Sequence, residues 1–139
     1  MIEQLLKPRE RSQPVDASQR ELIDLLRRMV LLPPRNAEKF HALFLDSQRS
    51  YLGGAPLGAG GTGTLSVRMR ALFETALALD ARGIIVAHNH PSGLCRPSEF
   101  DIDATRRLKL VAEALDIELL DHLIITTNSI YSMRAGGNL

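Results

Sequence analysis

The chain of 139 residues has the size of one ordinary domain, long enough to bury a hydrophobic core without covalent or metal support. It is 45% hydrophobic and 24% charged, and its net charge of +1 gives no overall attraction to nucleic acid or membranes, although a local basic patch stays open. A single cysteine excludes an intramolecular disulfide, and the lack of a signal peptide or long apolar run predicts a cytoplasmic protein without a membrane span.

Two segments precede the first predicted strand. Residues 1–16 mix charged residues with Pro8 and Pro14 and show no sustained period, so we expect a flexible leader followed by a single domain over residues 17–139. From Ala17 to Leu31, apolar residues recur at helical spacing and charged residues fill the other side. This pattern predicts an amphipathic helix that Pro33-Pro34 ends.

The next segments predict a strand, a loop and a second helix. The run FHALFLD, residues 40–46, predicts a strand, and the residues after it predict a turn that leads into a glycine-rich loop or flap, Gly53–Gly63. A short extended piece, TLSV, follows. The stretch from Met69 to Ala81 then predicts a helix with one apolar stripe, formed by Leu72, Phe73, Ala76, Leu77 and Ala78.

The second half of the chain predicts a buried strand, a long helix and two closing strands. Residues 84–87, IIVA, are apolar at every position, so both faces of a strand formed by them would be apolar. This is typical of a strand covered on both faces. A helix from about Ser98 to Leu115 follows, and then strands at residues 117–126 and 130–134. Helices that alternate with strands predict a layered α/β or α+β sheet domain.

Polar side chains gather directly after the IIVA strand. Side chains two residues apart in a strand project to the same face, so His88 and His90 should leave the strand end on one side. Asp101 lies three residues after the expected N-cap, Ser98, on the inward stripe of the next helix. Two imidazoles and one carboxylate can therefore converge, which predicts a three-ligand metal site.

Zinc suits this set of ligands. Zn²⁺ binds imidazole nitrogen and carboxylate oxygen, and catalytic sites typically combine three protein ligands with one water. The ion lowers the pKa of that water toward about 7, and a nearby carboxylate must then take the proton and pass it to a leaving group. Manganese or iron fit the same ligands.

Each part of the motif also has a simpler explanation. Ser98 and Asp101 fit a helix capping box with Asp in place of Glu or Gln, and a single histidine at a strand end is often a structural hydrogen-bonding residue. The HNH letters are contiguous here, whereas HNH nucleases disperse the three residues. Zinc deaminases require H-x-E and P-C-x-x-C, which this sequence lacks.

The full spacing is more specific than its parts. His88-x-His90, seven intervening residues before Ser98 and two more before Asp101 resemble the metal-binding signature of the JAMM (JAB/MPN+) metallopeptidases. The flanking HNHPSG, TRRL and LLDHLII are similar to the JAB domain of the RadC family, over about Glu38 to Arg134. The resemblance implies a JAB/MPN fold of the cytidine-deaminase-like kind and a zinc held by the two histidines and the aspartate. It also implies that Ser98 helps to stabilise an oxyanion.

The same resemblance assigns the general base. RadC-like sequences carry a Glu-x-Phe-x-x-Leu-x-Leu-Asp run, and EKFHALFLD matches it from Glu38 onward. Glu74, on the polar side of a helix, and Glu99, turned to a helix's outer face, are the alternatives. Longer RadC chains carry an N-terminal helix-hairpin-helix domain, which we expect to be absent because only 37 residues precede Glu38.

Three segments depart from the family pattern. Residues 68–71 read Arg-Met-Arg-Ala where the family usually has His-Pro-Arg-Glu, the Gly53–Gly63 segment is richer in glycine, and Leu94 stands where Asp is common. The sequence leaves open what these segments do for a substrate.

Cys95 and His122 each have two interpretations. Cys95 is either a zinc ligand that takes the place of the water or a loop cysteine without a chemical role. His122 either orients a metal ligand or forms a polar pair with Asp121 where a strand leaves the core.

The sequence therefore predicts a zinc-dependent hydrolase of amide or isopeptide bonds that acts on a protein or peptide. A metal-bearing scaffold without turnover is one alternative. The other is a DNA-repair module that binds or processes nucleic acid through a basic face, formed by Arg20, Arg27, Arg28, Arg68, Arg70, Arg106 and Arg107.

Overall fold

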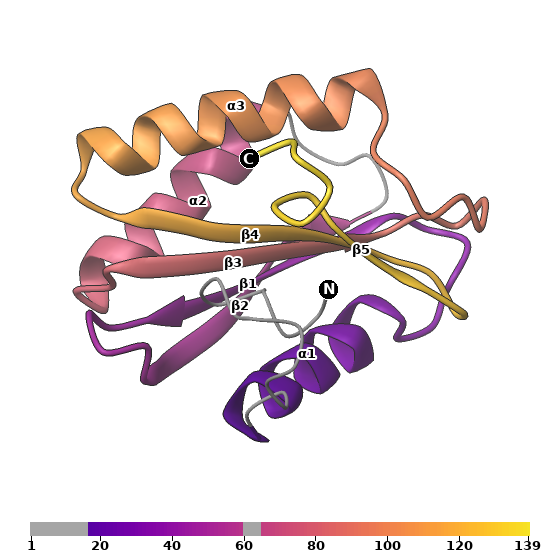
Figure 1. Ribbon diagram of the computed structural model, residues 1–139, viewed down its shortest axis with the longest axis horizontal. Helices are drawn as coiled ribbons and strands as arrows, with labels where there is room; N and C mark the ends of the chain where they lie inside the picture. The colour runs from indigo at the N-terminus through magenta and orange to yellow at the C-terminus, as the bar shows by residue number, and fades with distance from the viewer. Residues whose placement is uncertain (1–16, 60–64) are drawn as a thin grey trace.

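A five-stranded sheet lies between two helical layers in the computed structural model, which describes residues 17–59 and 65–139 (Figure 1). The predicted leader, residues 1–16, lies outside the described residues. The elements in chain order are α1 (Ala17–Val30), β1 (Lys39–Leu45), β2 (Tyr51–Ala59), α2 (Leu65–Ala78), β3 (Gly83–Asn89), α3 (Glu99–Ala114), β4 (Glu118–Ile125) and β5 (Ile130–Ser132). This arrangement confirms the predicted layered fold.

The strand order of the sheet is β2-β1-β3-β4-β5. Among the strands of the described residues, only β3 and β4 pair in parallel. A parallel pair needs a crossover connection, which α3 supplies. Every residue of β3 is buried, as the uninterrupted apolar run at residues 84–87 predicted. The chain therefore leaves the carboxyl end of a central, covered strand, passes through the loop at residues 90–98 and then enters α3.

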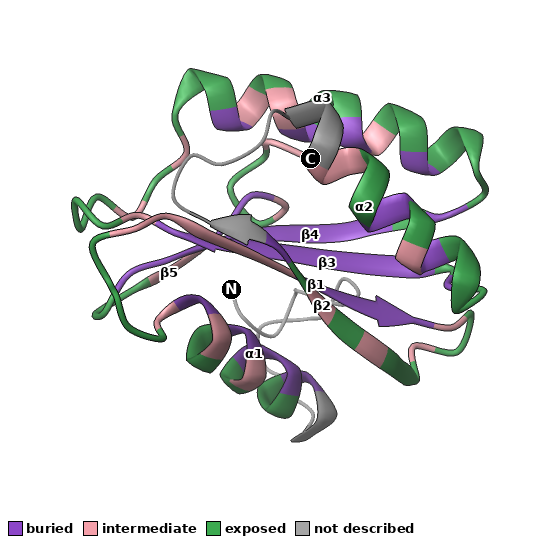
Figure 2. Cartoon of the chain, turned by 180° about the vertical axis from the view of Figure 1, so that it is seen from behind, coloured by how far each residue is buried: buried purple, intermediate pink, exposed green. Residues whose placement is uncertain are grey.

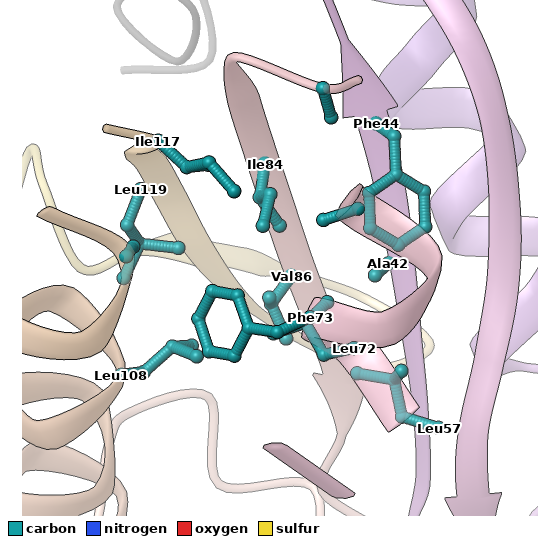
Figure 3. Close-up of a cluster of buried hydrophobic side chains, with 13 residues drawn as sticks. Ala42, Phe44, Leu57, Leu72, Phe73, Ile84, Val86, Leu108, Ile117 and Leu119 are labelled. Carbon is teal, nitrogen blue, oxygen red and sulfur yellow. The ribbon is translucent and has the colours of Figure 1, made fainter. Parts of the chain in front are cut away.

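Each face of the sheet has its own core, because alternate strand residues point to opposite sides. The apolar side of α1 covers one face, where its side chains pack against those of β1, β3 and β4. α2 and α3 cover the other face, and Figure 3 shows Phe73 and Leu108 of these helices meeting Val86 of β3. The central strands are consequently buried from both sides, as the purple ribbons of β3 and β4 in Figure 2 show.

The predicted glycine-rich loop is wrong over its described part. Residues from Gly53 to Ala59 belong to β2, which pairs antiparallel with β1, while residues 60–63 lie outside the described residues. A Cβ on Gly54 would approach Leu43 Cδ2 to 3.0 Å and the Ala42 carbonyl to 3.2 Å. The glycine thus permits close pairing of β2 with β1, a contact that local composition does not reveal.

The second helix also differs from its prediction. α2 begins at Leu65 and ends at Ala78, so the extended piece is wrong for residues 65–67, and the helix stops before Ala81. Leu72, Phe73 and Ala76 are buried as predicted, whereas Leu77 is 58% exposed. A three-residue window is too short for its period to separate a strand from the start of a helix.

None of the helices in the described ranges is long and apolar enough to cross a membrane.

Candidate metal centre

Two histidines converge at the carboxyl end of β3. The His88 side chain is fully buried in the sheet, and the His90 side chain, one residue beyond the strand, is 14% exposed. Their Nε2 atoms lie 3.0 Å apart, as the two-residue period of a strand predicted.

Asp101 completes the group from the first turn of α3. Its Oδ2 lies 3.1 Å from His90 Nε2, and its Oδ1 lies 3.5 Å from His88 Nε2. Among the residues that the structure describes, these three have one ligand atom each within 4.8 Å of the others. Tetrahedral zinc ligands are about 3.3 Å apart, a value that follows from bond lengths of about 2.0 Å. The group is therefore close to metal-binding geometry.

The hydrogen bond on the far side of His90 supports this assignment. His90 Nδ1 lies 2.9 Å from the Leu94 carbonyl oxygen, and because a carbonyl only accepts, Nδ1 carries the proton. When His90 loses its second proton, as a metal ligand must, the lone pair is at Nε2, which faces His88 and Asp101. A nitrogen lone pair beside a carboxylate suits a cation, so the three side chains can bind a divalent metal ion.

Ser98 holds Asp101 in place through a capping box. The Asp101 backbone N–H donates to Ser98 Oγ at 3.1 Å, and the Ser98 backbone N–H donates to Asp101 Oδ2 at 2.9 Å. Burial by itself raises the pKa of the Asp101 carboxyl, but the adjacent His88 imidazole and the hydrogen bonds from Ser98 outweigh it and hold this pKa well below its usual range. The capping box and the ligand geometry therefore coexist, since the cap keeps an ionised carboxylate aimed at both histidines.

Glu38 lies on the wall of an open cleft that His90 and Asp101 also line. It directly precedes β1, whose Phe40 pairs with His88 of β3, and this register brings Glu38 toward His90. The described residues that line the cleft include Glu38, His90 and Ser98, but neither Glu74 nor Glu99. The structure thus brings the predicted base to the predicted ligands.

Asn89 is a residue of this site that the sequence reasoning missed. Its side chain is buried, its Oδ1 accepts from the Lys39 backbone N–H at 2.6 Å, and its Nδ2 donates to the Ala37 carbonyl at 3.1 Å. These two bonds hold the backbone on either side of Glu38. Its position between two histidines was a signal, but its partners lie 50 and 52 residues away in sequence.

The structure places His122 against His88, where Nε2 of His122 lies 2.7 Å from Nδ1 of His88. Burial lowers the pKa of His122 well below its usual value, and the neighbouring His88 lowers it further. Asp121 does not pair with this imidazole, because its Oδ1 accepts the backbone N–H of His122 instead. The contacts therefore favour the interpretation that His122 orients a ligand.

The Cys95 thiol makes its hydrogen bond outside the group of three ligand residues. It donates to the Ile124 carbonyl at 3.3 Å, and burial raises the pKa of this thiol. It is not in the His88, His90 and Asp101 group, so the described geometry gives no support to a cysteine ligand.

Arg68 belongs to residues 68–71, which depart from the family pattern, and it lies close to the metal-binding residues. The Arg68 guanidinium lies 4.2 Å from the centroid of the Phe40 ring, which stacks on His88 at 4.8 Å. Arg68 also borders a mostly apolar pocket that touches both Asp101 and His122. The pocket and the metal-site cleft share Phe100 and Asp101, so the two are contiguous.

Asp121→Asn should change the pH dependence of stability in the metal-free protein. Burial raises the pKa of Asp121 to about 6, more than hydrogen bonds from Ser132, Arg134 and His122 lower it. Because the folded pKa exceeds the unfolded one, the contribution to stability is fully present below about pH 4 and is lost as pH rises through about 6. Relative to the variant, the wild type should lose roughly 2–3 kcal/mol of unfolding free energy across this window.

Urea unfolding at several pH values measures this difference. The comparison cancels the opposite contribution of His122, whose lowered pKa makes stability fall as pH decreases. Parallel pH profiles for the wild type and the Asn variant would contradict the assignment.

The arginines of the predicted basic face are divided between opposite sides of the sheet. Those of α1 lie in the layer on one face, and those of α2 and α3 in the layer on the other (Figure 1). They do not form one continuous surface.

Comparisons with known proteins agree with the predicted family and fold. The family model described as RadC-like JAB domain matches residues 17–138. A UPF0758 protein of Legionella pneumophila (strain Corby) is 42% identical over 98 residues, which cover 70% of this chain and 43% of that protein. One from Flavobacterium johnsoniae is 41% identical over 95 residues, 68% of this chain and 42% of that protein. Another, from Burkholderia thailandensis, is 35% identical over 132 residues, 95% of this chain and 50% of that protein. The chain spans about half the length of the curated relatives it matches.

Proposed function

The chain belongs to the family of RadC-like JAB domains, and from this premise we propose that it is a zinc-dependent hydrolase of amide or isopeptide bonds, of the JAMM type. One observation carries the proposal. His88, His90 and Asp101 converge at a cleft that Glu38 and Ser98 also line. A metal site, a carboxylate base and a hydroxyl donor are the parts that hydrolysis by an activated water requires.

Each side chain has a part in the proposed reaction. When bound, the metal supplies Lewis acidity and lowers the pKa of a water toward about 7. Glu38 accepts a proton from the attacking water and delivers it to the leaving nitrogen. The Ser98 hydroxyl accepts from the Asp101 backbone N–H, so its own proton is free to donate to the developing oxyanion.

The surroundings of the cleft suit a protein or peptide substrate. The cleft is open to solvent, and the contiguous apolar pocket offers a place for an apolar side chain next to the scissile bond. Phe100, 61% exposed, lies on the wall that the cleft and the pocket share. We therefore expect an extended chain to cross the cleft.

Elemental analysis of purified protein tests the metal assignment. We expect about one zinc per wild-type chain and a large loss in His88→Ala, because a buried ligand is removed. His41→Ala is the matched control, since His41 lies on the neighbouring β1 and belongs to no metal-binding group in the described part of the chain. A wild type that stays metal-free after added zinc would overturn the proposal.

The nucleic-acid module and the metal-bearing scaffold were the two alternatives to a hydrolase, and a different observation bears on each. The divided arginines give no specific support to a nucleic-acid module, so we do not propose one. A scaffold without turnover would also bind metal, and only a test of Glu38 separates it from a hydrolase. The cytoplasmic location stays a prediction from the sequence.

A further inference from the structure

A chain of hydrogen bonds behind the metal centre connects two of the three ligand residues. We call it the His122 relay; it consists of the Asp101 carbonyl, the Thr105 hydroxyl and the imidazoles of His122 and His88. Thr105 Oγ1 lies 2.7 Å from the Asp101 carbonyl oxygen and 2.7 Å from His122 Nδ1. His122 Nε2 lies 2.7 Å from His88 Nδ1. The relay thus links α3 to β3 by way of β4.

The direction of every hydrogen bond in the relay follows from the Asp101 carbonyl at its end, because a carbonyl can only accept. A carbonyl oxygen cannot donate, so the single proton of Thr105 goes to Asp101, the residue four positions earlier in the helix. Thr105 Oγ1 must therefore accept from His122 Nδ1–H. The neutral His122 ring then has its lone pair at Nε2 and accepts from His88 Nδ1–H. Met133 Sδ, 3.5 Å from the Thr105 hydroxyl, is a weaker acceptor and leaves this order unchanged.

The relay determines which nitrogen of His88 can bind a metal. With the proton on Nδ1, the lone pair of His88 lies on Nε2, the atom that faces His90 Nε2 and Asp101. Either ring nitrogen of an isolated neutral histidine can carry the proton, so this tautomer needs a fixed partner. His88, Thr105 and His122 are 0%, 1% and 5% exposed, so a solvent molecule does not readily replace a lost partner.

We propose that Thr105 and His122 are positioning residues, which hold His88 in its metal-binding tautomer and orientation. The inference rests on the proposed function, since it concerns the same metal site. Thr105 is the more informative residue to change, because Thr105→Val removes the hydroxyl and keeps the shape of the side chain. Thr105→Ser restores the hydroxyl and serves as the matched control.

The test measures zinc affinity by competition with a chelator, with thermal unfolding as the check on folding. Thr105→Val should weaken zinc binding about tenfold, in line with other residues that support metal ligands. Thr105→Ser and His41→Gln, the latter a histidine of β1 outside the metal-binding group, should bind zinc as the wild type does. Thr105→Ala, which removes the same hydroxyl with less bulk, replaces the valine variant if that variant does not fold.

A second readout needs neither metal nor substrate. Long-range proton–nitrogen correlation spectra of the metal-free wild type should show the proton of His88 on Nδ1, and Thr105→Val should move part of it to Nε2. Zinc binding by Thr105→Val as tight as that of Thr105→Ser would overturn the inference and leave the proposed function intact. An Nε2–H tautomer of His88 in the wild type would overturn it as well. A wild type that binds no zinc would overturn the proposed function, and the positioning role with it.

Discussion

Glu38→Gln should lower turnover by about 10²–10⁴-fold while the metal stays bound. Glutamine has nearly the shape of glutamate but cannot accept a proton, and the loss of a positioned general base typically costs about 10²–10⁴-fold in rate. Glu38 is not one of the three metal-binding residues, and its backbone is held by Asn89 on both sides, so the substitution should leave the site assembled. The measurement is hydrolysis of a panel of linear and isopeptide-linked peptides by zinc-loaded protein.

The control for this experiment is Glu99→Gln. Glu99 is an exposed residue in the first turn of α3, two residues from Asp101, and it does not line the described cleft. We expect this variant to retain wild-type activity. Activity of Glu38→Gln close to the wild-type level would contradict the assigned base. A zinc-loaded wild type that hydrolyses none of the peptides would instead favour the scaffold.

Asp101→Asn should remove most of the metal affinity without unfolding the protein. The carboxylate provides the only negative charge among the three ligand residues, and an amide oxygen is a neutral, weaker ligand. We expect zinc affinity to fall by more than about 100-fold, beyond the loss typical of supporting residues. Asparagine Oδ1 can still accept the Ser98 backbone N–H, so the capping contribution of about 1 kcal/mol should remain.

Asp103→Asn is the matched control on the same helix. Asp103 is exposed and pairs with Arg106 at 3.3 Å, a surface ion pair of small energetic value. Chelator competition should give the wild-type zinc affinity for this variant, and circular dichroism should give similar unfolding curves for both variants. Wild-type zinc affinity in Asp101→Asn would show that the aspartate is not a ligand.

The sequence predicted much of the site because its parts are close together in the chain. His88 and His90 share a strand end, and Asp101 follows in the first turn of the next helix. The two-residue repeat of a strand and the 3.6-residue repeat of a helix were therefore enough to predict that the three side chains meet. Glu38 was assigned only through the resemblance to RadC-like sequences. No local pattern links it to residue 90, because their proximity depends on the antiparallel register of β1 and β3.

By itself, the sequence determined the layered sheet, the buried β3 strand and the three candidate ligands, since these depend on apolar periodicity and on neighbours within about fifteen residues. Only the tertiary structure decided that Gly53–Ala59 is a strand, that Asn89 holds the segment around Glu38, and that Thr105 and His122 lie behind His88. The physical reason is that a buried polar group must find a partner somewhere in the fold. Which partner it finds depends on how β1, β4 and α3 pack around β3, and that packing is a property of the whole chain.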